Sequence, residues 1–307
     1  MPDASATEGS AGRPTPFGRM LTAMVTPFSD DGALDLAAAQ EVAAHLVDNG
    51  HDGLVISGTT GESPTTTDAE KDALLRAVVE AVGDRAHVVA GVGTFDTEHT
   101  MESARAAEKA GASGLLVVTP YYNKPPQSGL LAHFRAVADT TDLDLLLYDI
   151  PGRTGTPIAT ETLIALAEHP RIVAVKDAKY DMFGTTQVLA ATDLAYYSGA
   201  DEMTLALLAM GAVGTVSVVG HVAGPQYAEM ISAVGAGDLD RARAIDRALV
   251  PAVRAIMTRT QGAIMAKAAL ELTGVLRNRR MRLPLVAATD DEVEVLRGDL
   301  AAAGLAA

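Results

Sequence analysis

The sequence predicts an α/β protein, a (β/α)8 TIM barrel with a small C-terminal helical appendage, and three observations support this fold. Short β-branched runs alternate with longer amphipathic segments, which is the pattern of repeated βα units. Several of these runs are apolar at nearly every position, as expected for parallel strands covered on both faces. Eight such runs within 307 residues fit one closed barrel with a small addition.

The expected strands and the clearest helices follow each other along the chain. The strands are expected at residues 21–28, 53–57, 87–92, 114–120, 143–150, 172–177, 194–198 and 215–219. The clearest helices are residues 36–49, 69–82, 97–110 and 129–139. A doubly wound open sheet is the main alternative. We favour the barrel because Gly91-Val92-Gly93 does not complete a dinucleotide fingerprint, since Asp96 stands where the third glycine belongs.

The strand pattern stops after about Val234, and helices are expected from there on. They are predicted at residues 238–249, 261–272 and 291–303, broken by Pro251, Gly274 and Pro284. We therefore expect a catalytic barrel over residues 17–236 and a C-terminal helical region over 237–307 that packs on it. Residues 1–16 are small, polar and without a signal-peptide pattern, and are expected to be a disordered tail.

Composition limits the classes of function. The net charge of −15 argues against a nucleic-acid partner, and any anionic substrate would need a locally positive site. No apolar run is long enough to span a bilayer, so no membrane association is expected. With no cysteine, a cytoplasmic location is expected. The seven histidines show no metal-site spacing, and no metal is expected.

Lys176 is the most informative single residue. It stands near the end of an expected buried strand, among apolar neighbours, although a charged lysine is costly to bury unless it is paired. This placement suggests an amine with a lowered pKa that can act as a nucleophile. A structural ion pair, for example with the adjacent Asp177, is the alternative and is slightly favoured on Lys176 alone.

Other strand ends also carry chemistry, and a barrel places all of them at one face. The second ends in hydroxyls and glycines (57–63), which suit a small anion or an ordinary polar turn. The fourth carries two adjacent tyrosines before a proline-rich loop (119–126). The fifth continues into Tyr148 and Arg153, a phenol for proton transfer and a guanidinium for a carboxylate. The seventh and eighth end in small residues, which leave room for a ligand or serve packing.

Four of these segments together resemble the dihydrodipicolinate synthase family of the pyruvate-dependent class I aldolase superfamily. They are Gly-Thr-Thr-Gly-Glu at 58–62, residues 119–125, Tyr-x-x-Pro-x-Arg-Thr-Gly at 148–155, and Val-Lys-Asp-Ala at 175–178. The similarity extends from about Phe17 to the C-terminus in the order expected along a barrel. Four motifs in register are far more specific than any one of them.

The resemblance implies covalent catalysis. Lys176 would form a Schiff base with the keto carbon of pyruvate, for which its amine must be neutral. Tyr148 matches the proton donor and acceptor near the Schiff base, and Thr59 and Tyr122 match the other members of a proton relay. In the family that last tyrosine enters from the neighbouring subunit.

The resemblance also implies the substrates. Thr60 and Val216 match positions that hold the pyruvate carboxylate and nearby backbone, and Arg153 would receive the carboxylate of aspartate 4-semialdehyde. The implied product is 4-hydroxy-tetrahydrodipicolinate, in the diaminopimelate route to lysine. No cofactor is implied, and the typical assembly is a homotetramer, a dimer of dimers. Val216, Asp177 and Lys179-Tyr180 are mild departures from the family pattern.

Regulation by lysine is expected to be weak or absent. Family members inhibited by lysine bind it at a dimer interface through a His, an Asn and a Glu around the second and third strands. Here the first two positions are Asp68 and Phe95, although Tyr121 and Glu98 remain. Because these replacements remove polar partners, the site should bind lysine poorly.

Two competing functions are considered. N-acetylneuraminate lyases and keto-deoxy sugar acid aldolases share the lysine and tyrosine of the superfamily. They usually lack the Arg-Thr-Gly segment that begins here at Arg153, and a shared fold alone cannot fix the substrate. A non-catalytic ligand-binding homologue is the second alternative, which retention of Lys176, Tyr148, Thr59 and Tyr122 together disfavours.

Overall fold

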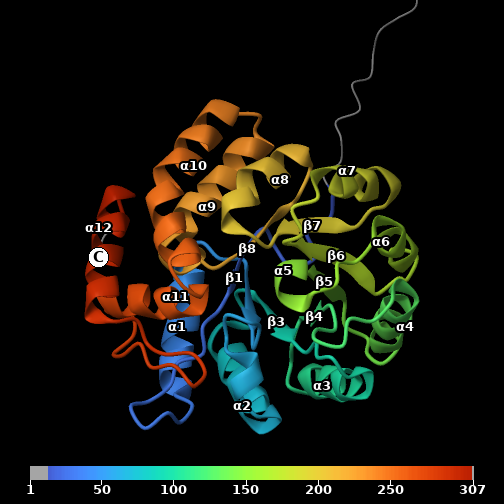
Figure 1. The fold of residues 1–307 in the computed structure, drawn as a ribbon, viewed down its shortest axis with the longest axis horizontal. Coiled ribbons are helices and arrows are strands. Elements are labelled where there is room, and N and C mark those ends of the chain that lie inside the picture. Colours follow the sequence, from blue (N-terminus) through green and yellow to red (C-terminus); the bar gives the residue numbers. More distant parts are fainter. Residues whose placement is uncertain (1–12, 306–307) are drawn as a thin grey trace, which may run out of the picture.

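The computed structural model describes residues 13–305, and eight parallel strands form a closed barrel in chain order (Figure 1). Each strand pairs with the next, and β8 pairs with β1. The strands are β1 (Met20–Ala23), β2 (Gly53–Ile56), β3 (His87–Gly91), β4 (Gly114–Val118), β5 (Leu145–Asp149), β6 (Ile172–Asp177), β7 (Ala195–Ser198) and β8 (Gly214–Ser217). The predicted barrel is therefore confirmed, and the open-sheet alternative is wrong.

The first strand is shorter than the predicted residues 21–28. The Met24 N–H still donates to Val55 O of β2 (3.0 Å), but the next N–H, that of Val25, donates to the side chain of His221 (Nε2, 3.1 Å) instead of to a strand. The other strands lie within two residues of their predicted bounds. Continuous apolar runs explain this agreement, since a parallel strand buried on both faces is apolar at nearly every position.

The apolar core has two layers. Alternate strand residues such as Leu146 and Ala174 point into the barrel and pack together there. Their neighbours, such as Leu145 and Val175, pack under the surrounding helices. Tyr148 also points into the barrel from β5, so the register of the strand places it at the carboxyl end of the barrel interior.

Helices cover the outside of the barrel (Figure 1). The barrel helices are α1 (Leu36–Asp48), α2 (Asp68–Val82), α3 (Thr97–Lys109), α4 (Gln127–Ala138), α6 (Thr160–Leu166), α7 (Met182–Ala191), α8 (Thr204–Met210) and α9 (Gly220–Gly235). Three short helical turns lie at strand ends: η1 (Ser63–Thr65), α5 (Pro151–Thr154) and η2 (Asp201–Met203). The start of α2 is fixed by a capping box between Thr67 and Glu70.

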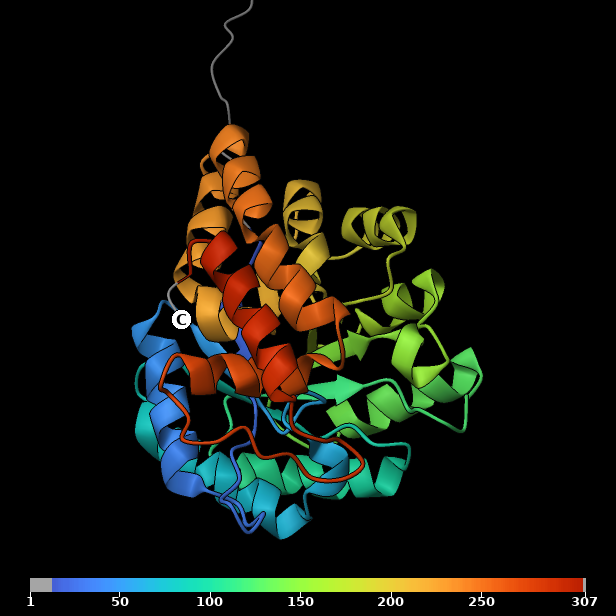
Figure 2. The ribbon, with the colours of Figure 1, turned by 60° about the vertical axis from the view of Figure 1, so that its left-hand side comes forward.

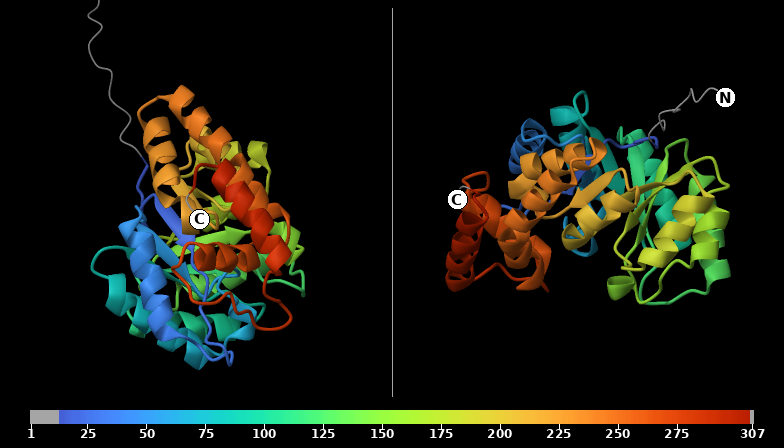
Figure 3. Two further views of the ribbon diagram at one scale, coloured as in Figure 1. Left: turned by 90° about the vertical axis from the view of Figure 1, so that its left-hand side faces the viewer. Right: turned by 90° about the horizontal axis from the view of Figure 1, so that it is seen from above.

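The C-terminal region packs beside the barrel as predicted, with one correction. It consists of α10 (Leu239–Val253), the π-helical turn η3 (Arg254–Thr258), α11 (Gly262–Leu272) and α12 (Asp290–Ala302). The predicted break at Pro251 is wrong, because α10 continues through Pro251 and Val253 into η3, and the chain turns only afterwards. Helices α10 and α11 pack on α9, and Figures 2 and 3 show the whole region as a layer on one side of the barrel.

Statements about the chain ends and about membrane-spanning helices apply only to the described residues. Residues 1–12 of the expected tail lie outside them. Within the remainder, the guanidinium of Arg13 donates to the backbone oxygens of Thr192 (2.8 Å) and Leu194 (3.3 Å), against the end of α7. Among residues 13–305, none of the helices has the length and apolar character needed to cross a membrane.

Candidate active site

Lys176 and Tyr148 lie side by side at the carboxyl end of the barrel. They are register partners on β6 and β5, so both side chains project from the same face of the sheet. The Lys176 Nζ lies 4.2 Å from the centroid of the Tyr148 ring. Only 4% of Lys176 and 6% of Tyr148 is exposed. The strand pairing therefore delivers an amine and a phenol to one buried point.

Burial changes the acid–base chemistry of both groups. Burial, reinforced by the positive charge of Arg153, lowers the pKa of Lys176 from 10.5 to about 7, although nearby Asp201 opposes the shift. Burial raises the pKa of Tyr148 to about 12, with Arg153 opposing. Near pH 7 the site therefore combines an amine that is about half neutral with a phenol that keeps its proton.

The alternative prediction, an ion pair between Lys176 and Asp177, is wrong. Asp177 accepts hydrogen bonds from the Thr185 hydroxyl (2.6 Å) and the Lys179 backbone N–H (2.8 Å). These bonds occupy its carboxylate behind the strand. On the other side, Gly199 makes room for the lysine, because a Cβ there would lie 2.9 Å from Lys176 Cγ.

A cavity of about 310 Å³ opens above this lysine. Three further predicted residues, Thr59, Thr60 and Arg153, line it together with Lys176 and Tyr148. Thr59 and Thr60 lie in the turn after β2, and Arg153 lies on α5 directly after β5. The remaining lining residues are Ala23, Gly58, Leu116, Ile150, Pro151, Gly152, Ala178, Lys179, Tyr180, Gly199, Ala200, Glu202, Val218 and Met257. Hydroxyls and a guanidinium thus surround the amine.

The structure does not bring two predicted residues to this cavity. Val216 is 1% exposed and packs in the barrel interior, whereas Val218, two residues later, lines the cavity. Tyr122 is 92% exposed, has a left-handed backbone (φ 70°) and does not line the cavity. The adjacent Tyr121 lines a smaller neighbouring cavity with Thr59 and Tyr148.

Other residues at the cavity were given no functional role from the sequence, although Tyr180 was noted as a departure from the family pattern. The Tyr180 hydroxyl donates to Glu202 (2.6 Å), which joins the loops after β6 and β7 at the cavity. Met257 reaches the cavity from η3, in the C-terminal region. The position of Tyr180, four residues after the lysine, was a usable signal. Nothing in the local sequence marks Met257, because its place depends on how the C-terminal helices pack.

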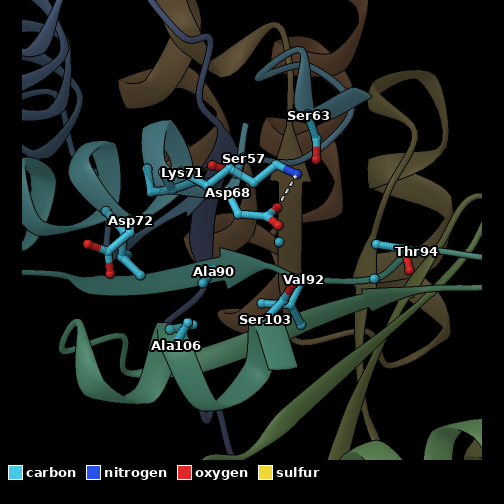
Figure 4. Close-up of a pocket in the computed structure, with 15 residues that line it drawn as sticks. Ser57, Ser63, Asp68, Lys71, Asp72, Ala90, Val92, Thr94, Ser103 and Ala106 are labelled. Carbon is cyan, nitrogen blue, oxygen red and sulfur yellow. Dashed lines mark ion pairs between the residues drawn. The ribbon is translucent and has the colours of Figure 1, made fainter. Parts of the chain in front are cut away.

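A further small cavity lies between α2, β3 and α3, and includes Asp68 (Figure 4). Its volume is about 60 Å³. The Lys71 ammonium lies 3.5 Å from Asp68, and His99 hydrogen-bonds the same carboxylate at 2.9 Å. The His99 hydrogen bond is the main cause that lowers the pKa of Asp68. Asp68 is therefore already engaged by two basic groups of its own chain.

The side chains that could bind a metal ion are scattered in the described part of the chain. Among residues 13–305, no group of three or more His, Cys, Asp or Glu side chains is arranged to hold a metal ion. The groups gathered at the main cavity are instead an amine, a phenol, hydroxyls and a guanidinium. This set suits imine chemistry on a small carboxylate substrate.

Comparison with known proteins agrees with this geometry. The model of the Dihydrodipicolinate synthetase family matches residues 16–303. The 4-hydroxy-tetrahydrodipicolinate synthase of Kineococcus radiotolerans is 68% identical over 291 residues, 95% of this chain and 94% of that protein. The protein of the same name from Acidothermus cellulolyticus is 66% identical over 292 residues, again 95% of this chain and 94% of that protein.

A solved structure extends the comparison to three dimensions. The crystal structure of DHDPS from Cyanidioschyzon merolae with lysine bound aligns with a TM-score of 0.91 at 43% identity, over 94% of this chain and 99% of that chain. The matches span the barrel and the C-terminal helices alike. This chain therefore belongs to the dihydrodipicolinate synthetase family.

Proposed function

We propose that this chain is a lyase that condenses pyruvate with aspartate 4-semialdehyde to give 4-hydroxy-tetrahydrodipicolinate, in the diaminopimelate route to lysine. Two relatives at 68% and 66% identity carry the name of this activity. The observation that carries the proposal is the buried amine of Lys176, held against Tyr148 in a cavity that Arg153 also lines.

The first step is attack of the Lys176 amine on the keto carbon of pyruvate. A carbon–nitrogen bond forms, the keto oxygen leaves as water, and an imine on Nζ remains. A pKa of about 7 makes about half of the amine neutral at pH 7, against well under about 0.1% for a lysine with the ordinary value. Desolvation by the cavity thus supplies the nucleophile.

The later steps return the lysine unchanged. The imine draws electrons from the pyruvate methyl group, which loses a proton and becomes the nucleophilic carbon of an enamine. That carbon attacks the aldehyde carbon of the second substrate. The amino group of the second substrate then attacks the imine carbon and displaces the Lys176 amine, which closes the ring and frees the product.

Hydroxyl groups move the protons that these steps require. Tyr148 keeps its proton because burial raises its pKa to about 12, so it can donate to an oxygen or nitrogen and recover the proton afterwards. Thr59 lines the same cavity and is proposed as its relay partner. Tyr122 is proposed as the third member, supplied to the site of a neighbouring subunit.

The carboxylates are assigned to separate groups. Thr60 and the backbone around Val216 are proposed to hold the pyruvate carboxylate, and Arg153 that of the semialdehyde. A guanidinium on an otherwise acidic protein supplies the local positive potential that anionic substrates require. Its charge also keeps the Lys176 pKa low, so one residue serves both binding and activation.

The proposed assembly is a homotetramer in the cytoplasm. The 92% exposure of Tyr122 supports a role outside its own chain, since a phenol at that position otherwise contacts only solvent. Sedimentation equilibrium tests the assembly. A protein that is active as a monomer would rule out the proposed contribution of Tyr122 to a neighbour.

Two measurements test the function. Borohydride reduction in the presence of pyruvate, followed by peptide mass spectrometry, should leave a stable adduct on Lys176. In a separate assay without borohydride, the protein should consume pyruvate only when aspartate 4-semialdehyde is added. Cleavage of N-acetylneuraminate in place of this reaction would assign a sugar-acid aldolase, and a folded protein without any adduct would assign a binding module.

A further inference from the structure

A second buried lysine, Lys267 of α11, forms an ion pair that the proposed mechanism does not use. Its Nζ lies 2.5 Å from Glu62 Oε1, and each of the two side chains is 1% exposed. The same amine donates to the backbone oxygen of Arg280 (2.7 Å) and lies 4.3 Å from the ring centroid of Phe28. Two opposite charges are thus fully enclosed between the barrel and the C-terminal region.

Glu62 belongs to the turn that presents Thr59 and Thr60 to the cavity. Its backbone N–H donates to Thr59 O (3.2 Å), and the next residue, Ser63, donates to Gly58 O (3.3 Å). Glu62 itself has a left-handed backbone, with φ of 55°. Residues with a Cβ rarely adopt this conformation unless the surroundings impose it. Glu62 is held both by its backbone oxygen, which accepts from the Thr65 N–H (3.0 Å), and by its carboxylate, which is paired with Lys267.

A second group from the C-terminal region holds the same turn. The Arg282 backbone N–H donates to the other carboxylate oxygen of Glu62 (3.0 Å). Its guanidinium pairs with Glu70 at the start of α2 (2.6 Å) and donates to the backbone oxygen of Thr65 (2.9 Å). Both oxygens of the Glu62 carboxylate are therefore bonded to the C-terminal region, which also holds the chain just after the turn, at Thr65.

We propose that Glu62 and Lys267 are positioning residues: their buried ion pair lets the C-terminal helical region fix the Thr59–Thr60 turn and so sets the affinity of the site for pyruvate. This inference rests on the proposed function, because it assigns Thr60 to the pyruvate carboxylate. Removing both charges of a buried ion pair costs much less stability than removing one, because neither charge is then left unpaired. If the pair acts by positioning the turn, removing both charges should weaken pyruvate binding without a matching loss of stability.

The test compares the natural chain with Lys267→Met, Glu62→Gln and the double variant Glu62→Gln/Lys267→Met. Two quantities are measured for each: the thermal unfolding midpoint, and the pyruvate concentration that half-saturates the borohydride-trapped adduct. Each single variant should lose stability, because one charged or polar group is left unpaired inside the protein. The double variant should regain most of that stability, while its half-saturating concentration stays about tenfold above that of the natural chain.

Arg279→Met is the matched control. Arg279 lies in the same C-terminal segment and pairs with Asp290 (2.5 Å) and Glu271, but those partners belong to the C-terminal region itself. Its loss should lower stability and leave the half-saturating pyruvate concentration unchanged. If Lys267→Met does not fold, the double variant and this control still decide the question.

Two results would overturn the inference. Recovery of pyruvate affinity together with stability in the double variant would make the ion pair a structural contact only. A half-saturating concentration that rises equally in Arg279→Met would show that affinity merely follows stability. A natural chain that forms no adduct at any pyruvate concentration is a distinct result, and it would overturn the proposed function as well.

Discussion

Lys176 and Lys267 are both buried, but they differ in what lies beside the amine. Lys267 faces the Glu62 carboxylate at 2.5 Å, with a backbone oxygen as a further acceptor. Lys176 faces an aromatic ring at 4.2 Å and an open cavity, and within residues 13–305 it forms no ion pair. Burial lowers the pKa of both, to about 7 for Lys176 and about 8 for Lys267.

The comparison shows how one residue type serves two purposes. Glu62 opposes the desolvation of Lys267, so that lysine is mostly charged at pH 7 and its geometry is fixed. Lys176 has only the more distant Asp201 in opposition, while Arg153 adds to the effect of burial. An amine becomes a nucleophile where the protein withholds a close counter-ion, and a structural anchor where it supplies one.

The largest expected difference concerns chemistry. Lys176→Met should remove the pyruvate adduct and lower kcat by about 10⁵-fold or more. The other lysine that lines the cavity, Lys179, is already engaged, since its ammonium lies 3.6 Å from the Asp149 carboxylate and donates to Ile158 O. Stability should not fall and should rise near pH 7, since methionine fills a similar volume and removes an amine whose charged form is disfavoured by burial. Lys267→Met is the control and should still form the adduct at saturating pyruvate. An adduct on the Lys176→Met protein would contradict the assignment of the nucleophile.

The free energy of unfolding should be lowered by replacing Lys267 and not by replacing Lys176. Lys267→Met should lower the free energy of unfolding by about 3–5 kcal/mol, because it leaves the Glu62 carboxylate buried without its partner. Urea denaturation of this variant beside Lys176→Met measures the difference directly. Equal stability of the two variants would show that the two lysines are not distinct in the way described.

The sequence could predict Lys176 but not Lys267, and the reason is physical. Lys176 interrupts an apolar strand, and strand periodicity is visible over a few residues. Lys267 is joined to Glu62 across 205 residues, through packing of α11 that no local pattern encodes. The barrel, most strand bounds and the cavity residues Thr59, Thr60, Tyr148 and Arg153 were within reach for the same local reason.

Predictions failed where a partner distant in sequence decides the outcome. The first strand ends early because His221 takes the hydrogen bond of Val25. Pro251 does not break α10, because the helix continues into η3 beneath the packing of α12. Tyr122 is a different case, because it lies outside the cavity of its own chain as an expected role in a neighbouring subunit requires, and that role stays a prediction.

Replacing Arg153 should have a smaller effect on catalysis than replacing Lys176. Arg153→Ala should raise the KM for aspartate 4-semialdehyde by about 10- to 100-fold, the value of a lost charged hydrogen bond. It should also raise the pKa of Lys176, because a positive charge that disfavours the ammonium is gone. The pH profile of adduct formation should therefore move to higher pH. Unchanged kinetics with the semialdehyde would count against the substrate assignment.

The pH dependence of the natural chain should be milder still. The rate of adduct formation should rise about tenfold between about pH 6 and pH 8, as the Lys176 amine loses its proton around pH 7. The same lowered pKa means that the unfolded chain binds more protons between about pH 7 and 10.5, so the free energy of unfolding rises with pH there. Lys176→Met should reduce that slope. A rate that is flat across this range would indicate an amine with an ordinary pKa.

The smallest effect is expected from free lysine, and a third lysine of the chain explains it. Lys71 is less buried than the other two, with 23% of its side chain exposed, and its ammonium lies 3.5 Å from Asp68. His99 bonds the same carboxylate, so an incoming ammonium would meet an acid that two groups of the chain already engage. L-lysine up to about 1 mM should therefore leave the condensation rate unchanged. Strong inhibition in a direct assay would show that free lysine can bind although Asp68 is already paired with Lys71 and His99.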